Sequence, residues 1–369
     1  MKKPKLIIIL LAIYVFLFNG QQELLSQPSL FTPDNQYIQY TGRIDFSNPQ
    51  KPRFSGAGAY LQVKFKGNTC SILLEDQCLN NNHNYISIAV DGKYQERIKL
   101  IKDKTEYQIA KNLEDAVHNL IVCKATEAQI GYVDFLGLLC SEILPPEKRR
   151  ERKIEFIGDS MTCGMGLDLS EIPCNTAQWY DQHNAYLAYG RLVADNLNAD
   201  WLFSSVSGIG VTRNWNSPGP TMPEVYEHVF LDTNSAIWNI NSYAPDLVSI
   251  CLGTNDFSDG DGTYKRDELD STKFINDYIQ FVKRIRARYP HAQICCLTSP
   301  MFSGEKSARL AEYLSAVIKH LKEVEKDDKV YMFKFSGSYT NGCDSHPDKQ
   351  EHEKMAEELL PFFKKVMNW

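Results

Sequence analysis

Four short segments of the sequence carry the residue types that acyl transfer requires. Ser160 follows Gly158 at the end of a short apolar run, where a turn can expose its hydroxyl, and Gly208, Asn255 and His346 lie in three later loops. A serine hydroxyl is a weak nucleophile that needs a base, and the oxyanion formed by its attack needs hydrogen-bond donors. These segments therefore predict a nucleophile, a backbone donor, an amide donor and a base.

His346 is the candidate base because it lies in a loop after the last predicted strand. Asp344 is two positions earlier, so in an extended loop its side chain points to the same side and could orient the imidazole. A backbone carbonyl could hold the ring instead, with Asp344 capping the turn. Asp159 and Asp256 are expected to tie loops together through hydrogen bonds to backbone N–H groups.

The predicted oxyanion hole combines the Ser160 N–H, the Gly208 N–H and the side-chain amide of Asn255. Glycine lets the backbone approach a substrate oxygen closely, and an amide donates a hydrogen bond without titrating. Gly208 could also be an ordinary turn glycine, since Gly210 follows it closely.

Alternating strands and helices after residue 151 predict a parallel sheet with helices on both faces. The strand-like runs are 154–157, 201–206, 246–252, 292–298 and 330–335, and the helix-like stretches are 276–288, 308–324 and 350–367. Ligands of such sheets bind beyond the carboxyl ends of the strands. Each candidate site residue follows a predicted strand, so all of them should meet at one edge.

Residues 30–145 show many short strand-like runs and no long helical period. Residues 61–65 and 85–90 alternate between apolar and polar positions, and the second run ends at Asp91-Gly92, a hairpin signal. This pattern predicts an all-β, jelly-roll-like sandwich, which could be a structural support or a glycan-binding module. Pro145, Pro146 and the charged run 148–153 mark the boundary with the α/β domain, predicted at 151–369, and that run is expected to be a solvated linker.

The composition and net charge indicate which classes of binding partner to expect. The chain has 369 residues, about two domains, and its net charge of −6 gives no reason to expect nucleic-acid binding. The ten cysteines show no zinc-ligand spacing, so metal binding is not expected. Cys163 and Cys174 flank one loop and are the first pair to suspect of a disulfide. The oligomeric state is left open.

Residues 1–20 have the character of a signal peptide. Lys2, Lys3 and Lys5 precede an apolar run at 6–18, which is too short for the roughly 20 residues that a membrane span needs. The chain is therefore expected to be secreted or periplasmic, without stable membrane insertion after cleavage. The alternative is an uncleaved anchor.

The ordered motifs resemble a known superfamily. The blocks Gly158-Asp159-Ser160, Gly208, Gly253-Thr254-Asn255-Asp256 and His346-Pro347 are similar, in order, to the four blocks of SGNH (GDSL) hydrolases. With the preceding sandwich, the chain resembles carbohydrate esterase family 2. The superfamily pattern places an acid where this chain has Cys343, whereas Asp344 fits the spacing of family 2. Relatives often carry tryptophan where this chain has Ser345.

The resemblance implies a three-layer αβα SGNH domain and a secreted O-acetyl esterase. Its substrates would be acetylated plant glycans of the xylan or glucomannan type, attacked through an acetyl-enzyme without a cofactor. Trp215, Asn214 and Trp179 are candidate sugar-binding residues, although each tryptophan could equally pack against the protein. The alternatives are a lipid esterase or thioesterase of the same superfamily, and a non-catalytic glycan-binding protein.

Overall fold

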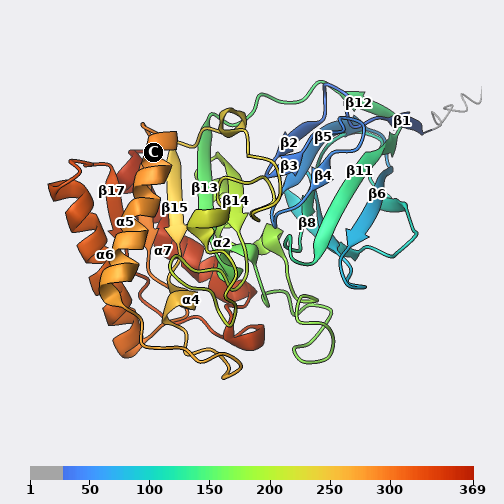
Figure 1. The fold of residues 1–369 in the computed structure, drawn as a ribbon. Coiled ribbons are helices and arrows are strands. Elements are labelled where there is room, and N and C mark those ends of the chain that lie inside the picture. Colours follow the sequence, from blue (N-terminus) through green and yellow to red (C-terminus); the bar gives the residue numbers. More distant parts are fainter. Residues whose placement is uncertain (1–27) are drawn as a thin grey trace, which may run out of the picture.

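The computed structural model describes residues 28–369, and the predicted signal peptide at 1–20 lies outside the described residues. Two parts lie side by side, an antiparallel β sandwich and an α/β part with a parallel sheet (Figure 1). The predicted fold class is confirmed. Among the helices of residues 28–369, none combines the length and the apolar character needed to span a bilayer.

The sandwich consists of two six-stranded antiparallel sheets with an apolar core between them. The first contains β1 (Ser29–Phe31), β3 (Ile44–Asp45), β4 (Arg53–Phe54), β6 (Cys70–Cys78), β9 (Glu106–Ala110) and β11 (Gly131–Cys140). The second contains β2 (Gln39–Thr41), β5 (Tyr60–Lys66), β7 (Tyr85–Val90), β8 (Lys93–Lys99), β10 (Val117–Lys124) and β12 (Glu142–Leu144).

Strand β7 departs from the expected half-buried pattern, because all six of its residues are buried. One face packs in the sandwich core and the other against the α/β part. The Ser87 hydroxyl donates to the Asn184 side chain at 2.7 Å, and the Tyr85 hydroxyl donates to Asp181 at 2.8 Å. Alternation alone could not reveal that the second domain covers this outer face.

The α/β part is built on a five-stranded parallel sheet in the order β14-β13-β15-β16-β17. Its strands are β13 (Arg152–Gly158), β14 (Ala199–Ser205), β15 (Leu247–Cys251), β16 (Gln293–Leu297) and β17 (Val330–Phe333). Its helices are α1 (Ser160–Cys163), α2 (Tyr189–Asn196), α3 (Met222–Val225), α4 (Thr254–Phe257), α5 (Ser271–Arg288), α6 (Gly304–Glu323) and α7 (Lys349–Met367), with 3-10 turns η1 (Ala185–Leu187), η2 (Ile240–Ser242) and η3 (Cys343–Ser345).

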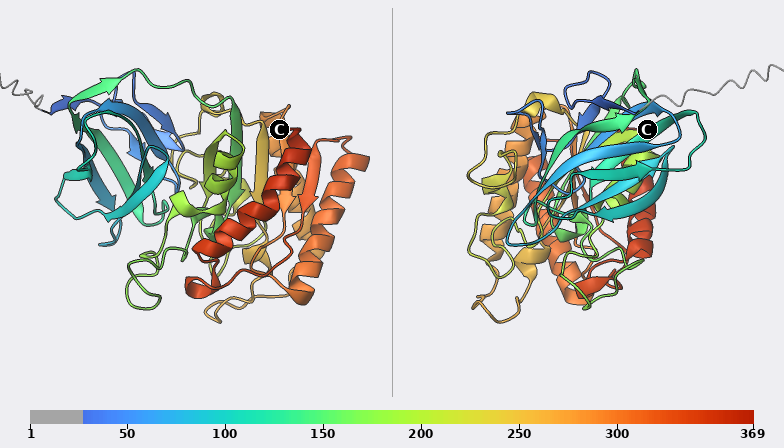
Figure 2. Two further views of the ribbon diagram at one scale, coloured as in Figure 1. Left: turned by 180° about the vertical axis from the view of Figure 1, so that it is seen from behind. Right: turned by 90° about the vertical axis from the view of Figure 1, so that its right-hand side faces the viewer.

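The helices form two outer layers around this sheet. Phe156 of β13 packs in a core with α2 and α7, and its neighbour Ile157 packs in the opposite core with α5 and α6. Alternate residues of a strand face opposite sides, so both faces of β13 are covered. The view from behind shows α7 lying across the sheet (Figure 2).

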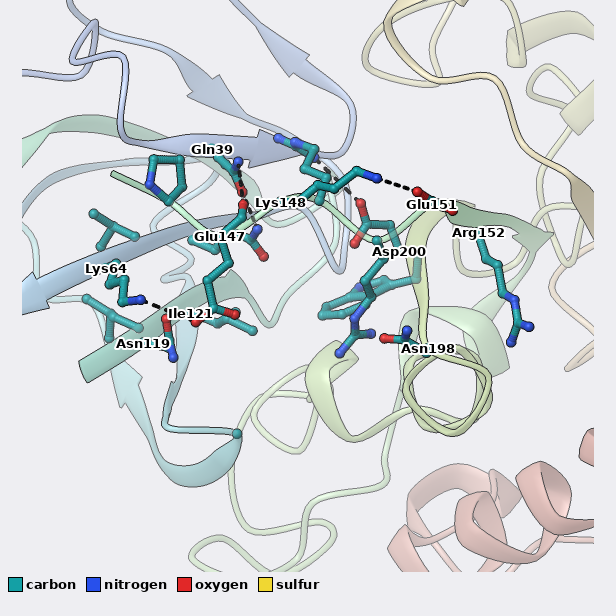
Figure 3. Close-up of a pocket in the computed structure, with 18 residues that line it drawn as sticks. Gln39, Lys64, Asn119, Ile121, Glu147, Lys148, Glu151, Arg152, Asn198 and Asp200 are labelled. Carbon is teal, nitrogen blue, oxygen red and sulfur yellow. Dashed lines mark hydrogen bonds and ion pairs between the residues drawn. The ribbon is translucent and has the colours of Figure 1, made fainter. Parts of the chain in front are cut away.

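The segment between the two parts is bonded to both, contrary to the expected solvated linker. The Arg149 guanidinium donates to the Tyr40 carbonyl at 2.6 Å and to the Thr41 hydroxyl at 2.8 Å, and Arg150 donates to Asp195 at 2.7 Å. A polar cavity of about 680 Å³ lies beside this segment (Figure 3). The Lys148–Glu151 ion pair beside the cavity is exposed, so Arg149 and Arg150 are the residues that connect this segment to the two parts.

Candidate active site

The end of β13 places Ser160 at the start of α1. Gly158 is required there, since a Cβ atom would lie 2.1 Å from the Thr162 hydroxyl. The buried Asp159 carboxylate caps the helix by accepting the Met161 N–H at 3.3 Å. The chain therefore turns sharply out of the sheet and presents the Ser160 hydroxyl at the strand's carboxyl end.

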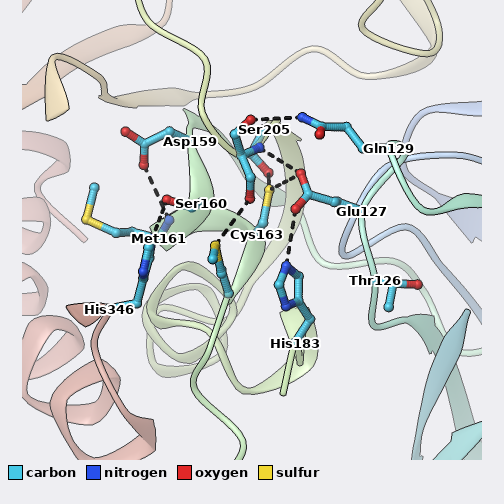
Figure 4. A network of polar contacts seen from close by, with 12 residues as sticks. Thr126, Glu127, Gln129, Asp159, Ser160, Met161, Cys163, His183, Ser205 and His346 are labelled. Carbon is cyan, nitrogen blue, oxygen red and sulfur yellow. Dashed lines mark hydrogen bonds and ion pairs between the residues drawn. The ribbon is translucent and has the colours of Figure 1, made fainter. Parts of the chain in front are cut away.

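His346 lies within hydrogen-bond distance of Ser160 although 186 residues separate them. Its Nε2 is 2.7 Å from the Ser160 Oγ (Figure 4). Its Nδ1 is 2.9 Å from the Asp344 main-chain oxygen. A carbonyl oxygen can only accept, so Nδ1 carries the proton and Nε2 accepts from the hydroxyl. This is the geometry of a nucleophile and its general base.

Asp344 supplies this orienting contact through its main chain instead of its carboxylate. The residue is exposed, and both Asp344 and Ser345 have left-handed backbone conformations, with φ of 52° and 58°. This turn points the carbonyl at the ring. The structure thus favours the carbonyl alternative over the carboxylate of a Ser-His-Asp triad.

Burial lowers the pKa of His346 below its usual value near 6.5, and the hydrogen bond to Asp344 only partly opposes this effect. The imidazole is therefore neutral at neutral pH, as a general base must be.

Two backbone N–H groups are available as oxyanion donors near Ser160. The Ser160 N–H is at the first position of α1, where helical N–H groups have no intrahelical acceptor. Gly208 follows β14 with φ of 78°, and its N–H has no hydrogen-bond partner among residues 28–369. Both residues line the same cleft.

Asn255 lines the cleft too, but its amide is already engaged. Its Nδ2 donates to the Ile209 carbonyl at 2.8 Å and to Asp159 at 3.2 Å. Burial raises the pKa of Asp159 to about 7. The neighbouring Asp256 carboxylate accepts N–H groups of residues 211–213, so both aspartates tie loops together as expected.

The cleft has a volume of about 680 Å³, and two large exposed aromatics line it. Trp179 is 40% exposed and Trp215 is 45% exposed. Asn214 differs from the expectation: it is buried, accepts the Gly210 N–H, and donates to the carbonyls of Gly219 and Pro220. It holds the loop that carries Trp215 and does not line the cleft described here.

Comparisons with known proteins agree with this geometry. Residues 40–146 match the carbohydrate esterase 2 N-terminal family, and residues 156–358 match the GDSL-like lipase/acylhydrolase family. A solved family two carbohydrate esterase from Clostridium thermocellum, in complex with cellohexaose, is 32% identical, with a TM-score of 0.80 over 90% of this chain and 99% of that one. The chain belongs to carbohydrate esterase family 2. It is a carboxylic ester hydrolase with an SGNH domain.

Two curated relatives extend this comparison. The cellulase/esterase CelE of Acetivibrio thermocellus is 33% identical over 91% of this chain, which spans only 40% of that protein. An acetylxylan esterase / glucomannan deacetylase of Cellvibrio japonicus is 28% identical over 95% of both chains.

The expected pairing of Cys163 with Cys174 is wrong. Cys174 forms a disulfide with Cys343, 169 residues away, and Cys163 is buried on α1 beside the Ser205 hydroxyl. The disulfide joins the loop of Trp179 to the loop of His346. The prediction relied on the short distance between the two cysteines in the sequence, but a disulfide requires that the two Cα atoms lie close together in the fold.

Two residues of the sandwich, Glu127 and Gln129, lie near the site, and the sequence did not predict this role for them. Glu127 is fully buried between β10 and β11 and contacts His183 and the Ser207 N–H of the other domain. Gln129 lines the catalytic cleft. Residues 124–127 lie within the match to the family's N-terminal domain, but no local pattern indicates contact with a loop 80 residues away.

Proposed function

We propose that this family 2 esterase removes O-acetyl groups from glycans through Ser160. The observation that carries the proposal is the 2.7 Å contact between His346 Nε2 and Ser160 Oγ, with Nδ1 fixed on a carbonyl. Ser160 attacks the acetyl carbon while His346 takes its proton. His346 then protonates the departing sugar hydroxyl, and water, activated by the same imidazole, releases acetate from the acetyl-enzyme.

The oxyanion is held by the Ser160 and Gly208 N–H groups, with the Asn255 amide as third donor. The longer of the two Asn255 contacts, that to Asp159, is the one exchanged for the oxyanion. Such donors act mainly on the transition state, where the charge develops.

The proposed substrates are acetylated chains of the xylan or glucomannan type. The Cellvibrio japonicus relative carries both activities in its name. Trp179 and Trp215 are partly exposed and line the same cleft as Ser160, where their rings could pack on the apolar faces of sugars. Export is proposed on two grounds: the basic and apolar character of residues 1–20, and the Cys174–Cys343 disulfide, a bond typical of oxidising compartments.

Acetate release from acetylated xylan, glucomannan and 4-nitrophenyl acetate tests the mechanism. Ser160→Ala and His346→Ala should each lose a thousandfold or more in kcat while unfolding at the wild-type midpoint. A Ser160→Ala protein that keeps a tenth of the activity would refute the mechanism. A wild-type protein that binds glycan but releases no acetate would be a binding protein.

Trp215→Ala tests the glycan platform. The variant should lose far more kcat/KM on acetylated glycan than on 4-nitrophenyl acetate, because the small ester makes no contact with remote sugar units. Equal losses on both substrates would assign Trp215 to support of the catalytic loop. Preferential hydrolysis of long-chain acyl esters by the wild type would favour the lipid esterase alternative.

A further inference from the structure

Both polar groups of the Ser207 main chain are bonded to side chains of the sandwich domain. The Ser207 N–H donates to Glu127 Oε2 at 2.7 Å, and the Ser207 carbonyl accepts from Gln129 Nε2 at 2.8 Å. Figure 4 labels Glu127 and Gln129. Ser207 directly precedes Gly208, the proposed oxyanion donor. The N-terminal domain therefore binds the main chain of the residue that precedes this donor.

The Gln129 contact acts on the same peptide unit that carries the oxyanion donor. The Ser207 carbonyl and the Gly208 N–H belong to one planar peptide and point in opposite directions. Fixing the carbonyl thus fixes the direction of the N–H. A hydrogen bond accepted by the carbonyl also polarises the N–H and strengthens it as a donor.

This peptide needs support because glycine does not hold its own conformation. Gly208 has φ of 78°, and a Cβ atom there would meet only Trp215, at 3.9 Å. The next peptide is fixed from the other side, since the Trp215 N–H donates to the Gly208 carbonyl at 2.8 Å. The sandwich thus supplies the contacts before Gly208, and the Trp215 loop supplies the contact after it.

Glu127 is itself held in place. It is fully buried, and His183 Nε2 lies 3.2 Å from its other carboxylate oxygen. Burial alone would raise the pKa of Glu127, but the hydrogen bonds from His183 and Ser207 outweigh it and the pKa is lowered. The buried Lys124 ammonium donates to the carbonyls of Thr126 and Glu127, which fixes the backbone of the same loop.

We propose that Glu127 and Gln129 are positioning residues that orient the Gly208 N–H toward the oxyanion. The sandwich is then a part of the catalytic centre in addition to any role in binding. The proposal rests on the proposed function, in which Gly208 is an oxyanion donor.

Gln129 provides the cleanest test because it is exposed and its replacement should not affect folding. Gln129→Glu keeps the shape of the side chain but offers no N–H to the Ser207 carbonyl at neutral pH. We expect this variant and Gln129→Ala to lose about tenfold in kcat on 4-nitrophenyl acetate with KM nearly unchanged. That is less than the hundredfold or more expected when an oxyanion donor itself is lost. Glu127→Ala should also lower kcat. If this variant does not fold, the kcat values of the two Gln129 variants test the proposal.

Arg149→Met is the matched control. It removes the hydrogen bonds between the connecting segment and the sandwich, at the opposite end of β13, roughly 20 Å away at strand spacing. We expect it to leave kcat unchanged.

Hydrogen–deuterium exchange of the segment 206–212 gives a readout that does not depend on turnover. Exchange there should be faster in the Gln129 and Glu127 variants and unchanged in Arg149→Met. Unchanged exchange in the Gln129 variants, or faster exchange with wild-type kcat, would overturn the proposal. A wild-type protein inactive on acetyl esters would refute the proposed function, while the exchange comparison would still test whether the sandwich holds this loop.

Discussion

A main-chain carbonyl occupies the position that a carboxylate fills in a Ser-His-Asp triad. The Asp344 oxygen keeps the proton on His346 Nδ1 and fixes the ring, but it stabilises the charged imidazolium less than a carboxylate would. The oxyanion donors must therefore supply a larger share of the transition-state stabilisation.

Replacement of the Asp344 carboxylate should have little effect. Asp344→Asn keeps the carbonyl that contacts His346, so we expect kcat to change less than about threefold, in contrast to the roughly ten-thousandfold loss when a triad aspartate is amidated. Steady-state kinetics on 4-nitrophenyl acetate measure this. A hundredfold loss would show that the carboxylate reaches the ring during turnover.

The pH dependence of kcat/KM should report the lowered pKa of His346. The base must be neutral, so activity is lost as the pH falls through the pKa of the folded enzyme. Since burial lowers that pKa, the acid limb should lie below about 6.5. A limb well above 6.5, or none down to the pH of acid unfolding, would contradict this assignment.

Asn255→Ala should lower kcat by roughly a hundredfold or more with little change in KM, because the oxyanion exists only near the transition state. A change confined to KM would assign Asn255 to substrate binding.

At the scale of elements, the loops that follow the strands build the site. Residues 160, 208 and 255 follow β13, β14 and β15, and the sequence predicted this convergence because parallel strands end at one edge. In Figure 1, α4 marks that lower edge. The five strands and three long helices predicted for the α/β part match observed ones closely, since buried strands and amphipathic helices leave a strong local pattern. The shorter helix α2 was not predicted.

Other features depend on contacts that no local pattern contains. The Cys174–Cys343 pairing and the Glu127 contact join segments far apart in sequence. The role of Asp344 depends on which way a carbonyl points, and the main chain is the same at every residue. Asn214 is polar enough to bind a sugar hydroxyl, but its side chain already forms hydrogen bonds with the main chain of its own loop.

The Cys174–Cys343 disulfide should stabilise the loops around His346 without being essential for catalysis. The Gly342 N–H donates to the His346 carbonyl at 2.7 Å, so the loop has support of its own. Reductant should lower the unfolding free energy by about 2–4 kcal/mol and leave kcat at 25 °C within a few-fold. The Cys174→Ser/Cys343→Ser double variant is the control and should not respond to reductant. A wild type equally insensitive would argue against the bond.

At the scale of the whole molecule, the two parts share one buried interface. Tyr60 of the sandwich stacks on Trp201 of β14, with ring centroids 4.2 Å apart. Arg43 is almost fully buried and donates to the Ser204 hydroxyl and the His228 carbonyl. A separated domain would expose these groups to water, so we expect the two parts to unfold together.

Tyr60→Ala should therefore destabilise both parts at once. Loss of a buried aromatic ring costs about 3 kcal/mol or more. Urea unfolding followed by tryptophan fluorescence and by far-ultraviolet circular dichroism should give a single, shifted transition. Tyr264→Ala, at an exposed tyrosine, should stay within about 0.5 kcal/mol of wild type. Two separate transitions would mean that the parts are independent.

The distance in sequence between Ser160 and His346 also sets the time at which activity can first appear. A chain is synthesised from its N-terminus, and its domains tend to fold in that order. The sandwich, with Glu127 and Gln129, is synthesised before the loop that it supports. His346 follows the nucleophile by 186 residues, so a nascent chain already has its serine and its oxyanion donors long before it has a base. Hydrolysis of an acetyl ester would therefore report that nearly the whole chain has been made and folded.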